Sequence, residues 1–151
     1  MNVVVGITGG IAAYKAVGVV RALVLAGHDV HVVATENALK FVGRPTLEAI
    51  SRNLVHSDLY EGVAEVRHVA IGQAADLIVV APATANTIAK LAAGLADDLL
   101  GNTILASTEL PSRSSASPAA SFAIVFAVAG AMTMRSAAWP MATCRTSATP
   151  S

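Results

Sequence analysis

Short runs of apolar, mostly β-branched residues recur through the first part of the chain. Val3–Ile7, Asp29–Ala34 and Asp76–Ala81 each have this composition, which is typical of strands that are buried on both faces of a sheet. Leu54–Leu59 is a weaker run that fits either a short strand or an extended segment. The pattern therefore predicts three buried strands and one further extended stretch.

Helical periodicity fills the intervals between these runs. Apolar residues recur at helical spacing over Ile11–Ala26, and Gly27 follows where a left-handed residue commonly ends a helix. Shorter helices are expected at Asn37–Phe41 and Thr46–Ser51, interrupted at Pro45, and at Thr84–Ala93 and Asp97–Ser107. The last of these is expected to lead toward a further strand.

This alternation of strands and helices predicts the α/β class, with a parallel sheet covered by helices on both faces. Ligands of such sheets bind beyond the carboxyl ends of the strands. The residues that follow each predicted strand are therefore the candidates for a functional site.

Composition narrows the function classes. At 151 residues the chain has the length of one domain. Its formal net charge is zero, which argues against nucleic acid or an anionic membrane as a partner. Cys144 is the one cysteine, which excludes a disulfide framework and a Cys-rich zinc site and suits a cytoplasmic location. The apolar stretch 122–130 is shorter than the ~20 residues of a membrane span.

Charge is divided unevenly along the chain. All ten acidic residues lie between Asp29 and Glu109, and beyond Glu109 the charged residues are three arginines among Ala, Ser, Thr and Pro. We therefore divide the chain into a domain at 1–108 and an Ala/Ser/Arg/Pro-rich tail at 109–151.

The first strand is followed by "GITGGIAAYK". Gly9 and Gly10 at a strand-to-helix turn let backbone N–H groups approach an anion beside the positive end of a helix dipole. The dinucleotide fingerprint G-x-G-x-x-G would need glycine at Thr8, and Lys15 lies too far into the helix for a Walker A loop. A phosphate site and a turn that needs glycine for backbone reasons are the two interpretations.

The second strand is followed by Thr35, Glu36 and Asn37. Thr35 can offer its hydroxyl to a phosphate or can cap the next helix, as Asn37 also can. Glu36 fits a ribose-binding acid of an NAD enzyme or a solvated glutamate in the first turn of a helix.

The third strand is followed by "PATANT", in which Thr84, Asn86 and Thr87 offer two hydroxyls and an amide without charge. His68 precedes that strand. Imidazole can accept a proton near neutral pH, so His68 is either a general base or a structural residue. His28, His31 and His56 have no metal-ligand spacing, and no metal is expected.

Together, "GITGGIAAYKA", "TENALKFV" and "RHVAIGQAADLIVVAPATANTIAKLAAGLADDLL" resemble the flavin-dependent cysteine decarboxylases. "PATANT" is very similar to that family's PASANT motif, and the histidine ahead of the motif is the family's catalytic base. The resemblance covers residues 2 to 107. It favours the phosphopantothenoylcysteine decarboxylase branch, usually the N-terminal half of a bifunctional coenzyme A biosynthesis protein in bacteria.

The resemblance implies a flavodoxin-like Rossmann fold that binds FMN and assembles as trimers or dodecamers, with flavin and substrate at a subunit interface. It implies FMN-binding positions at Gly9, Gly10, Ile11, Thr35, Thr84, Ala85, Asn86 and Thr87, and a catalytic base at His68. In this family FMN takes a hydride from the cysteinyl end of phosphopantothenoylcysteine. The resulting thioaldehyde favours loss of CO2, and the returned hydride gives 4′-phosphopantetheine.

The resemblance ends near Thr108. The family continues with a strand, a P-x-M-N-x-x-M-W type motif that clamps the substrate carboxylate, and a flap that carries a cysteine. "IVFAVAGAMTMRSAAW" echoes these only distantly, and Cys144 has no assignable flap role. We interpret the tail as the product of a shifted reading frame, with a native but divergent segment as the alternative. A parallel sheet incomplete at its C-terminal side and little or no decarboxylase turnover are expected.

Three other interpretations stay open at this point. One is another flavoprotein of the superfamily, either a prenyl-FMN synthase or a peptidyl-cysteine decarboxylase. A second is a non-enzymatic FMN-binding regulatory subunit. A third is an NAD-binding Rossmann enzyme, which the missing G-x-G-x-x-G pattern disfavours.

Overall fold

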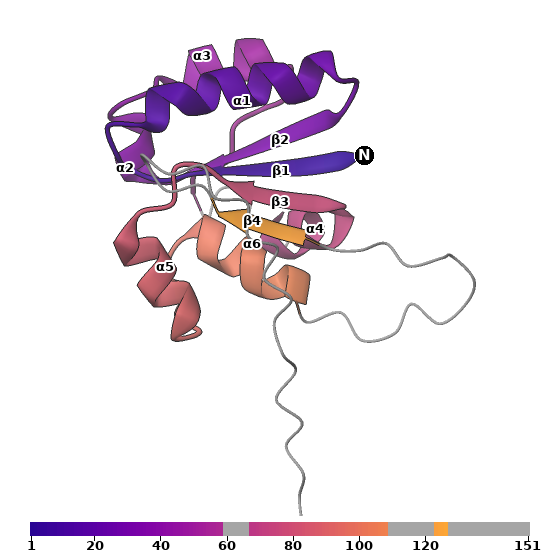
Figure 1. Ribbon diagram of the computed structural model, residues 1–151. Helices are drawn as coiled ribbons and strands as arrows, with labels where there is room; N and C mark the ends of the chain where they lie inside the picture. Colours follow the sequence, from indigo (N-terminus) through magenta and orange to yellow (C-terminus); the bar gives the residue numbers. More distant parts are fainter. Residues whose placement is uncertain (59–66, 109–122, 127–151) are drawn as a thin grey trace, which may run out of the picture.

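The computed structural model describes residues 1–58, 67–108 and 123–126. Its strands are β1 (Asn2–Ile7), β2 (Asp29–Ala34), β3 (Leu77–Val80) and β4 (Ala123–Phe126). They form a parallel sheet in the order β2-β1-β3-β4 (Figure 1). The predicted α/β class is confirmed, and this order is that of flavodoxin-like doubly wound folds.

Helices cover both faces of the sheet. The helices α1 (Ala13–Leu25) and α3 (Arg44–Ser51) lie on one face, and α4 (Arg67–Ala74) and α6 (Leu99–Thr108) lie on the other (Figure 1). Alternate residues of β1 supply the two cores, because successive strand side chains point to opposite faces. Val5 packs toward α1, and Val4 packs toward α6.

The helix α1 begins two residues later than predicted. The Ala13 N–H donates to the Gly10 carbonyl at 2.9 Å, so residues 10–12 form a turn ahead of the helix. The end of α1 is as predicted, since Gly27 has φ +83°. Two hydrogen bonds, from Gly27 N–H to Val24 and from His28 N–H to Leu23, complete a Schellman motif there.

The shorter helices follow the predicted order. The helix α2 spans Glu36–Leu39, and α5 spans Ala85–Ala92. Pro45 does not interrupt the chain between α2 and α3, because it lies in the first turn of α3, where a missing N–H costs no hydrogen bond. Beyond α3 the chain is extended and forms one parallel bridge, His56 to Val33. Residue 59 lies outside the described residues.

The helix α4 has no counterpart in the predicted elements. It packs closely on α6, since a Cβ added at Gly72 would stand 2.6 Å from the carbonyl oxygen of Thr103. The strand β4 lies within the segment separated as a tail, and it pairs with β3 through Val79 and Val125. The rest of the tail lies outside the described residues. Among the described helices, none has the length and apolar run that crossing a membrane requires.

Candidate functional site

A cavity of about 590 Å³ lies at the carboxyl ends of β1, β2 and β3. This volume falls within the range of ~300–1,000 Å³ typical of small-ligand sites. The loop after β1, the head of α2, the segment after α3, the head of α5 and the head of α6 all contribute to its walls. Figure 1 shows α2 and α5 together at the left end of the sheet, opposite the N-terminus.

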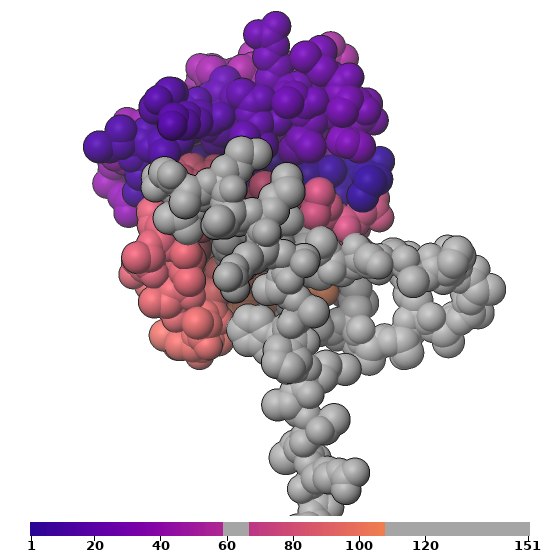
Figure 2. All heavy atoms as spheres, viewed as in Figure 1, coloured from indigo at the N-terminus to yellow at the C-terminus, as the bar shows by residue number. Residues whose placement is uncertain are grey.

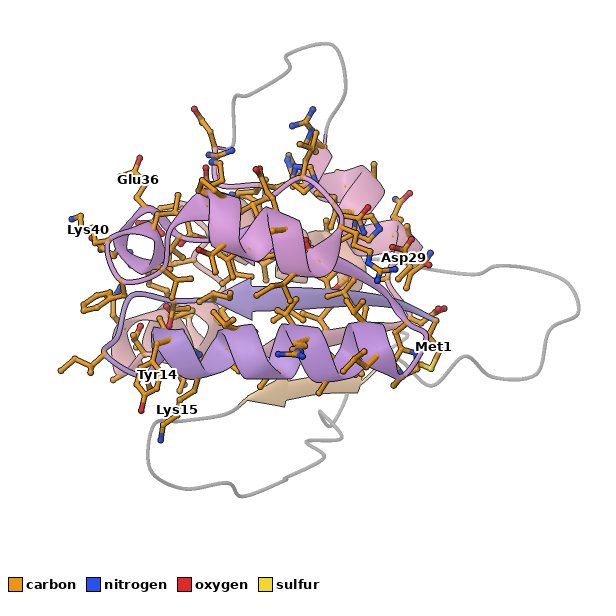
Figure 3. All side chains as sticks on the ribbon, turned by 90° about the horizontal axis from the view of Figure 1, so that it is seen from above. Met1, Tyr14, Lys15, Asp29, Glu36 and Lys40 are labelled. Carbon is orange, nitrogen blue, oxygen red and sulfur yellow. The ribbon has the colours of Figure 1, made fainter. Side chains whose placement is uncertain are left out.

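Figures 2 and 3 show the same elements at this end of the sheet. In Figure 2 the salmon surface of α5 lies below the indigo surface of the N-terminal part on that same side. In Figure 3, which views the molecule from above, Glu36, Lys40, Tyr14 and Lys15 gather at one end, and Met1 and Asp29 lie at the other. The cavity therefore lies where doubly wound folds bind ligands.

The structure brings together the residues predicted from three separate strand ends. The side chains or backbone of Gly9, Thr35, Thr84, Asn86 and Thr87 line the cavity. The remaining three predicted cofactor positions, Gly10, Ile11 and Ala85, are their chain neighbours and are not among the lining residues. Ile11 is 80% exposed, so its side chain points away from the protein interior.

The loop after β1 offers backbone donors. The N–H groups of Gly9, Ile11 and Ala12 donate to no acceptor within residues 1–58, 67–108 and 123–126. Gly10 differs, because its N–H donates to the Thr8 carbonyl at 3.0 Å. Free N–H groups just ahead of an α-helix form a site suited to an anionic group such as phosphate.

Thr35 caps α2, one of the two roles weighed for it. Its hydroxyl oxygen accepts the Ala38 N–H at 3.3 Å. Asn37 does not cap, and its Oδ1 accepts a hydrogen bond from Lys40 Nζ at 2.7 Å. The Thr35 hydroxyl proton is not used by the cap, so the residue can still donate to a ligand in the cavity. Glu36 is exposed in the first turn of α2 and lines the same cavity.

Thr84 and Thr87 form the head of α5. The Thr84 hydroxyl oxygen accepts the Thr87 N–H at 3.3 Å, which is an N-cap, and the two hydroxyl oxygens lie 2.9 Å apart. Asn86 is exposed between them, and its amide makes no hydrogen bond to any described residue. This wall presents hydroxyls and an amide to the cavity without a formal charge.

Charged side chains also line the cavity. Among the described residues these are the carboxylates of Glu36, Asp58, Asp97 and Asp98 and the ammonium of Lys90. Lys90 Nζ lies 2.6 Å from Asp97 Oδ2. The hydrogen bond from Lys90 lowers the pKa of Asp97, and the same bond raises the pKa of Lys90. An anionic ligand group is therefore favoured at the free N–H groups of the loop after β1 and disfavoured beside Asp97 and Asp98.

His68 lies apart from this cavity within a single chain. It occupies the first turn of α4, is half-buried and is not among the lining residues. The helix α4 ends near the amino end of β1, where Asn2 Nδ2 donates to the Ala74 carbonyl at 3.2 Å. The first turn of α4 therefore lies toward the carboxyl side of the sheet, but on the α6 face.

Several lining residues were not among the predicted site residues. Ser57 and Asp58 come from a segment that carried no recognised motif, and Asp97 and Asp98 lie in the stretch that carries the family resemblance but were given no role. Thr8 was considered only as a position where glycine is missing, although a hydroxyl at the end of a buried strand is itself a signal of a polar role. Within the part of the chain that the structure describes, no group of three His, Cys, Asp or Glu side chains is arranged to hold a metal ion.

Comparison with known proteins agrees with this geometry. The sequence pattern of the family described as Flavoprotein matches residues 1–134. The chain belongs to the Flavoprotein family. The match passes residue 108 and includes β4.

Individual relatives extend the comparison. The chain is 60% identical over 104 residues to the coenzyme A biosynthesis bifunctional protein CoaBC of Mycolicibacterium smegmatis, a match that covers 69% of this chain and 25% of that protein. The chain thus spans about a quarter of the length of this relative.

Two solved structures share the flavoprotein fold. The FMN-dependent cysteine decarboxylase SpaF superposes with a TM-score of 0.68 at 30% identity, covering 83% of this chain and 67% of that one. A mutant of PPC decarboxylase superposes with a TM-score of 0.57 at 28% identity, covering 71% of this chain and 62% of that one.

Proposed function

We propose that the chain binds FMN in this cavity and is the FMN-binding part of a phosphopantothenoylcysteine decarboxylase of coenzyme A biosynthesis. The observation that carries the proposal is the convergence of the free N–H groups after β1 with the Thr84–Thr87 head of α5. In a member of the Flavoprotein family, this arrangement suits FMN. The FMN phosphate needs hydrogen-bond donors, and the flavin ring needs small polar neighbours.

The residues of the cavity fit FMN. The N–H groups of Gly9 and Ile11, with the Thr35 hydroxyl, would hold the phosphate. Thr84 and Thr87 are small enough for a flat ring to approach, and Asn86 would hydrogen-bond the polar edge of that ring. The carboxylates of Asp97 and Asp98, just ahead of α6, repel a phosphate and favour its placement at the loop after β1.

FMN, when bound, supplies a hydride acceptor for the cysteinyl end of the substrate, which makes loss of CO2 chemically accessible. His68 would take the proton from that end of the substrate as the general base. His68 does not line the cavity of its own chain. We therefore assign His68 to a site that a second copy of the chain completes, in a cytoplasmic homo-oligomer.

A second candidate substrate is a cysteine at the end of a peptide. The likeness to the cysteine decarboxylase SpaF supports it. The identity to CoaBC is twice as high, 60% against 30%, which favours the coenzyme A precursor.

The test compares two purified proteins with phosphopantothenoylcysteine and FMN. One is the chain itself, and the other carries residues 1–108 followed by the corresponding remainder of the decarboxylase part of the Mycolicibacterium relative. We expect the hybrid to release CO2 and form 4′-phosphopantetheine, and the chain itself to turn over little or not at all. A hybrid that binds FMN and does not turn over this substrate, but decarboxylates a peptide ending in cysteine, would overturn the assignment in favour of the second candidate.

A further inference from the structure

Thr8 links the loop after β1 to the loop after β3. Its side chain is 1% exposed. The Thr8 hydroxyl donates to the Pro82 carbonyl at 2.5 Å and accepts the Thr84 N–H at 3.0 Å. The Thr8 N–H also donates to the Pro82 carbonyl, at 3.3 Å. Three hydrogen bonds therefore join two loops that lie more than 70 residues apart in the sequence.

These two loops carry the two sides of the cavity that suit a flavin. Gly9, directly after Thr8, begins the group of free N–H donors. Thr84 begins α5 and holds Thr87 through the N-cap. The Thr8 hydroxyl thus adds two hydrogen bonds, beside the backbone bonds, between the loop with the donors for a phosphate and the loop with the hydroxyls beside a ring.

The chemistry of this position calls for a hydroxyl side chain. A hydroxyl donates its O–H to a carbonyl while its oxygen accepts from an N–H; an aliphatic side chain does neither, and an ionised carboxylate only accepts. Valine has the shape of threonine without the hydroxyl, so it would leave the Thr84 N–H without its acceptor. A part-buried donor without a partner carries a desolvation penalty, and the loop after β3 would shift to relieve it.

We propose that Thr8 is a positioning residue for FMN, and that its hydroxyl holds the loops after β1 and β3 at the spacing that the cofactor needs. The proposal rests on the proposed function, because it concerns the same cavity. Thr8 lines the cavity, but its hydroxyl acts through the two loops, because the O–H donates to the Pro82 carbonyl and the oxygen accepts the Thr84 N–H.

The experiment compares the full chain with Thr8→Val, Thr8→Ser and the control Ser51→Ala. Ser51 is a matched control because it is 3% exposed, donates to the Asn53 carbonyl at 3.0 Å and accepts the Asn53 N–H at 3.2 Å, outside the cavity. Each protein is titrated with FMN by flavin fluorescence. Exchange of the Thr84 N–H with solvent deuterium is followed by NMR, and thermal unfolding is recorded.

We expect Thr8→Val to raise the Kd for FMN about tenfold, the effect of one unsatisfied donor, and to speed exchange of the Thr84 N–H. Thr8→Ser should restore both to within about threefold of the unaltered chain, since it keeps the hydroxyl. Ser51→Ala should lower the unfolding temperature and leave the Kd unchanged. If Thr8→Val does not fold, Thr8→Ala against Thr8→Ser isolates the hydroxyl, because both lack the methyl group.

The outcomes separate the two proposals. Failure of the unaltered chain to bind FMN would overturn the proposed function, and the role of Thr8 with it. If the unaltered chain binds FMN and loss of the Thr8 hydroxyl leaves the Kd unchanged, the role of Thr8 alone would be overturned. Equal weakening by Thr8→Ser and Thr8→Val would also overturn it, because the methyl packing and not the hydroxyl would then matter.

Discussion

Gly9 lies against the backbone of Asn37, where the loop after β1 meets α2. A Cβ added at Gly9 would stand 2.3 Å from the Asn37 Cβ and 2.9 Å from its carbonyl carbon. The carbonyl carbon belongs to the helix backbone and cannot rotate away as the end of a flexible side chain can. Packing therefore requires glycine at position 9, in addition to any need for access to its N–H.

We expect Gly9→Ala to destabilise the fold by about 1–3 kcal/mol, the usual effect of overpacking, and to weaken FMN binding because the loop must move. Urea unfolding and an FMN titration measure the two effects. Gly10→Ala is the control, since its Cβ would find Thr84 Cγ2 no closer than 3.9 Å. Equal stability losses for the two variants would contradict the explanation from packing.

The ion pair between Lys90 and Asp97 predicts a dependence on pH. The hydrogen bond from Lys90 lowers the pKa of Asp97 below its ordinary value of 3.8. The stabilisation of the pair is therefore present above that value and is lost as the pH falls through the lowered pKa of the folded state. The hydrogen bond with Asp97 raises the pKa of Lys90. The stabilisation that the charged Lys90 contributes is therefore lost as the pH rises through that raised pKa.

An NMR titration of the Asp97 carboxyl carbon measures this effect. Lys90→Gln should return the pKa of Asp97 toward its ordinary value. Lys40→Gln is the control, because Lys40 Nζ donates to Asn37 and not to a carboxylate. A pKa of Asp97 that responds equally to both substitutions would mean that the pair has no specific effect.

The sequence predicted the strands β1, β2 and β3, because each is a short apolar run. It also predicted helix ends at residues that favour one backbone conformation or one capping hydrogen bond. Gly27 has the left-handed conformation that its position predicts. Thr35 caps α2, one of the two roles that its position after the second strand suggests. Local signals of this kind act within a few residues and do not depend on the rest of the fold.

The helix α4 and part of the cavity wall were not predictable in the same way. The sequence of α4, "RHVAIGQA", contains Gly72 and has weak helical amphipathicity, so its helix depends on packing against α6. Ser57 and Asp58 reach the cavity because the segment after α3 returns along β2. The function of Thr8 depends on a partner, Pro82, 74 residues away. The frameshift interpretation of the tail stays a prediction, and reading the gene in its other two frames beyond codon 108 tests it.

Contact between α4 and α6 predicts the effect of Gly72→Ala. The added Cβ would meet the Thr103 carbonyl oxygen at 2.6 Å and the Ser107 nitrogen at 3.2 Å, both backbone atoms. We expect a loss of about 1–3 kcal/mol in the free energy of unfolding. Gly18→Ala in α1 is the control, because nothing lies within 4 Å of its Cβ. That substitution should stabilise the fold by roughly 0.5–1 kcal/mol, and urea unfolding of both variants checks the pair.

The proposed role of His68 predicts a split between binding and turnover. In the hybrid with the relative's C-terminal remainder, His68→Asn should lower decarboxylation by about 10²–10⁴-fold, the usual contribution of a general base. FMN affinity should stay within about twofold, because His68 is proposed to act on the substrate and does not line the FMN cavity of its own chain. An equal loss of FMN binding and of turnover would indicate a structural role for His68.

A mixing experiment tests whether two copies build one site. At a limiting FMN concentration the His68→Asn and Gly9→Ala hybrids should each have low activity, one because its base is removed and the other because its FMN binding is weakened. Unfolding and refolding them together should restore part of the activity, because some sites then combine an intact base with an intact flavin pocket. Activity that stays at the sum of the separate variants would contradict a shared site.

The most direct test of the central claim is a titration of the purified chain with FMN, followed by flavin fluorescence and visible absorption, with NAD as the competitor. We predict saturable binding of one FMN per chain, a change in the visible flavin bands, and no displacement by NAD. An unchanged flavin spectrum at every protein concentration, or displacement of FMN by NAD, would contradict the assignment of this cavity to a flavin.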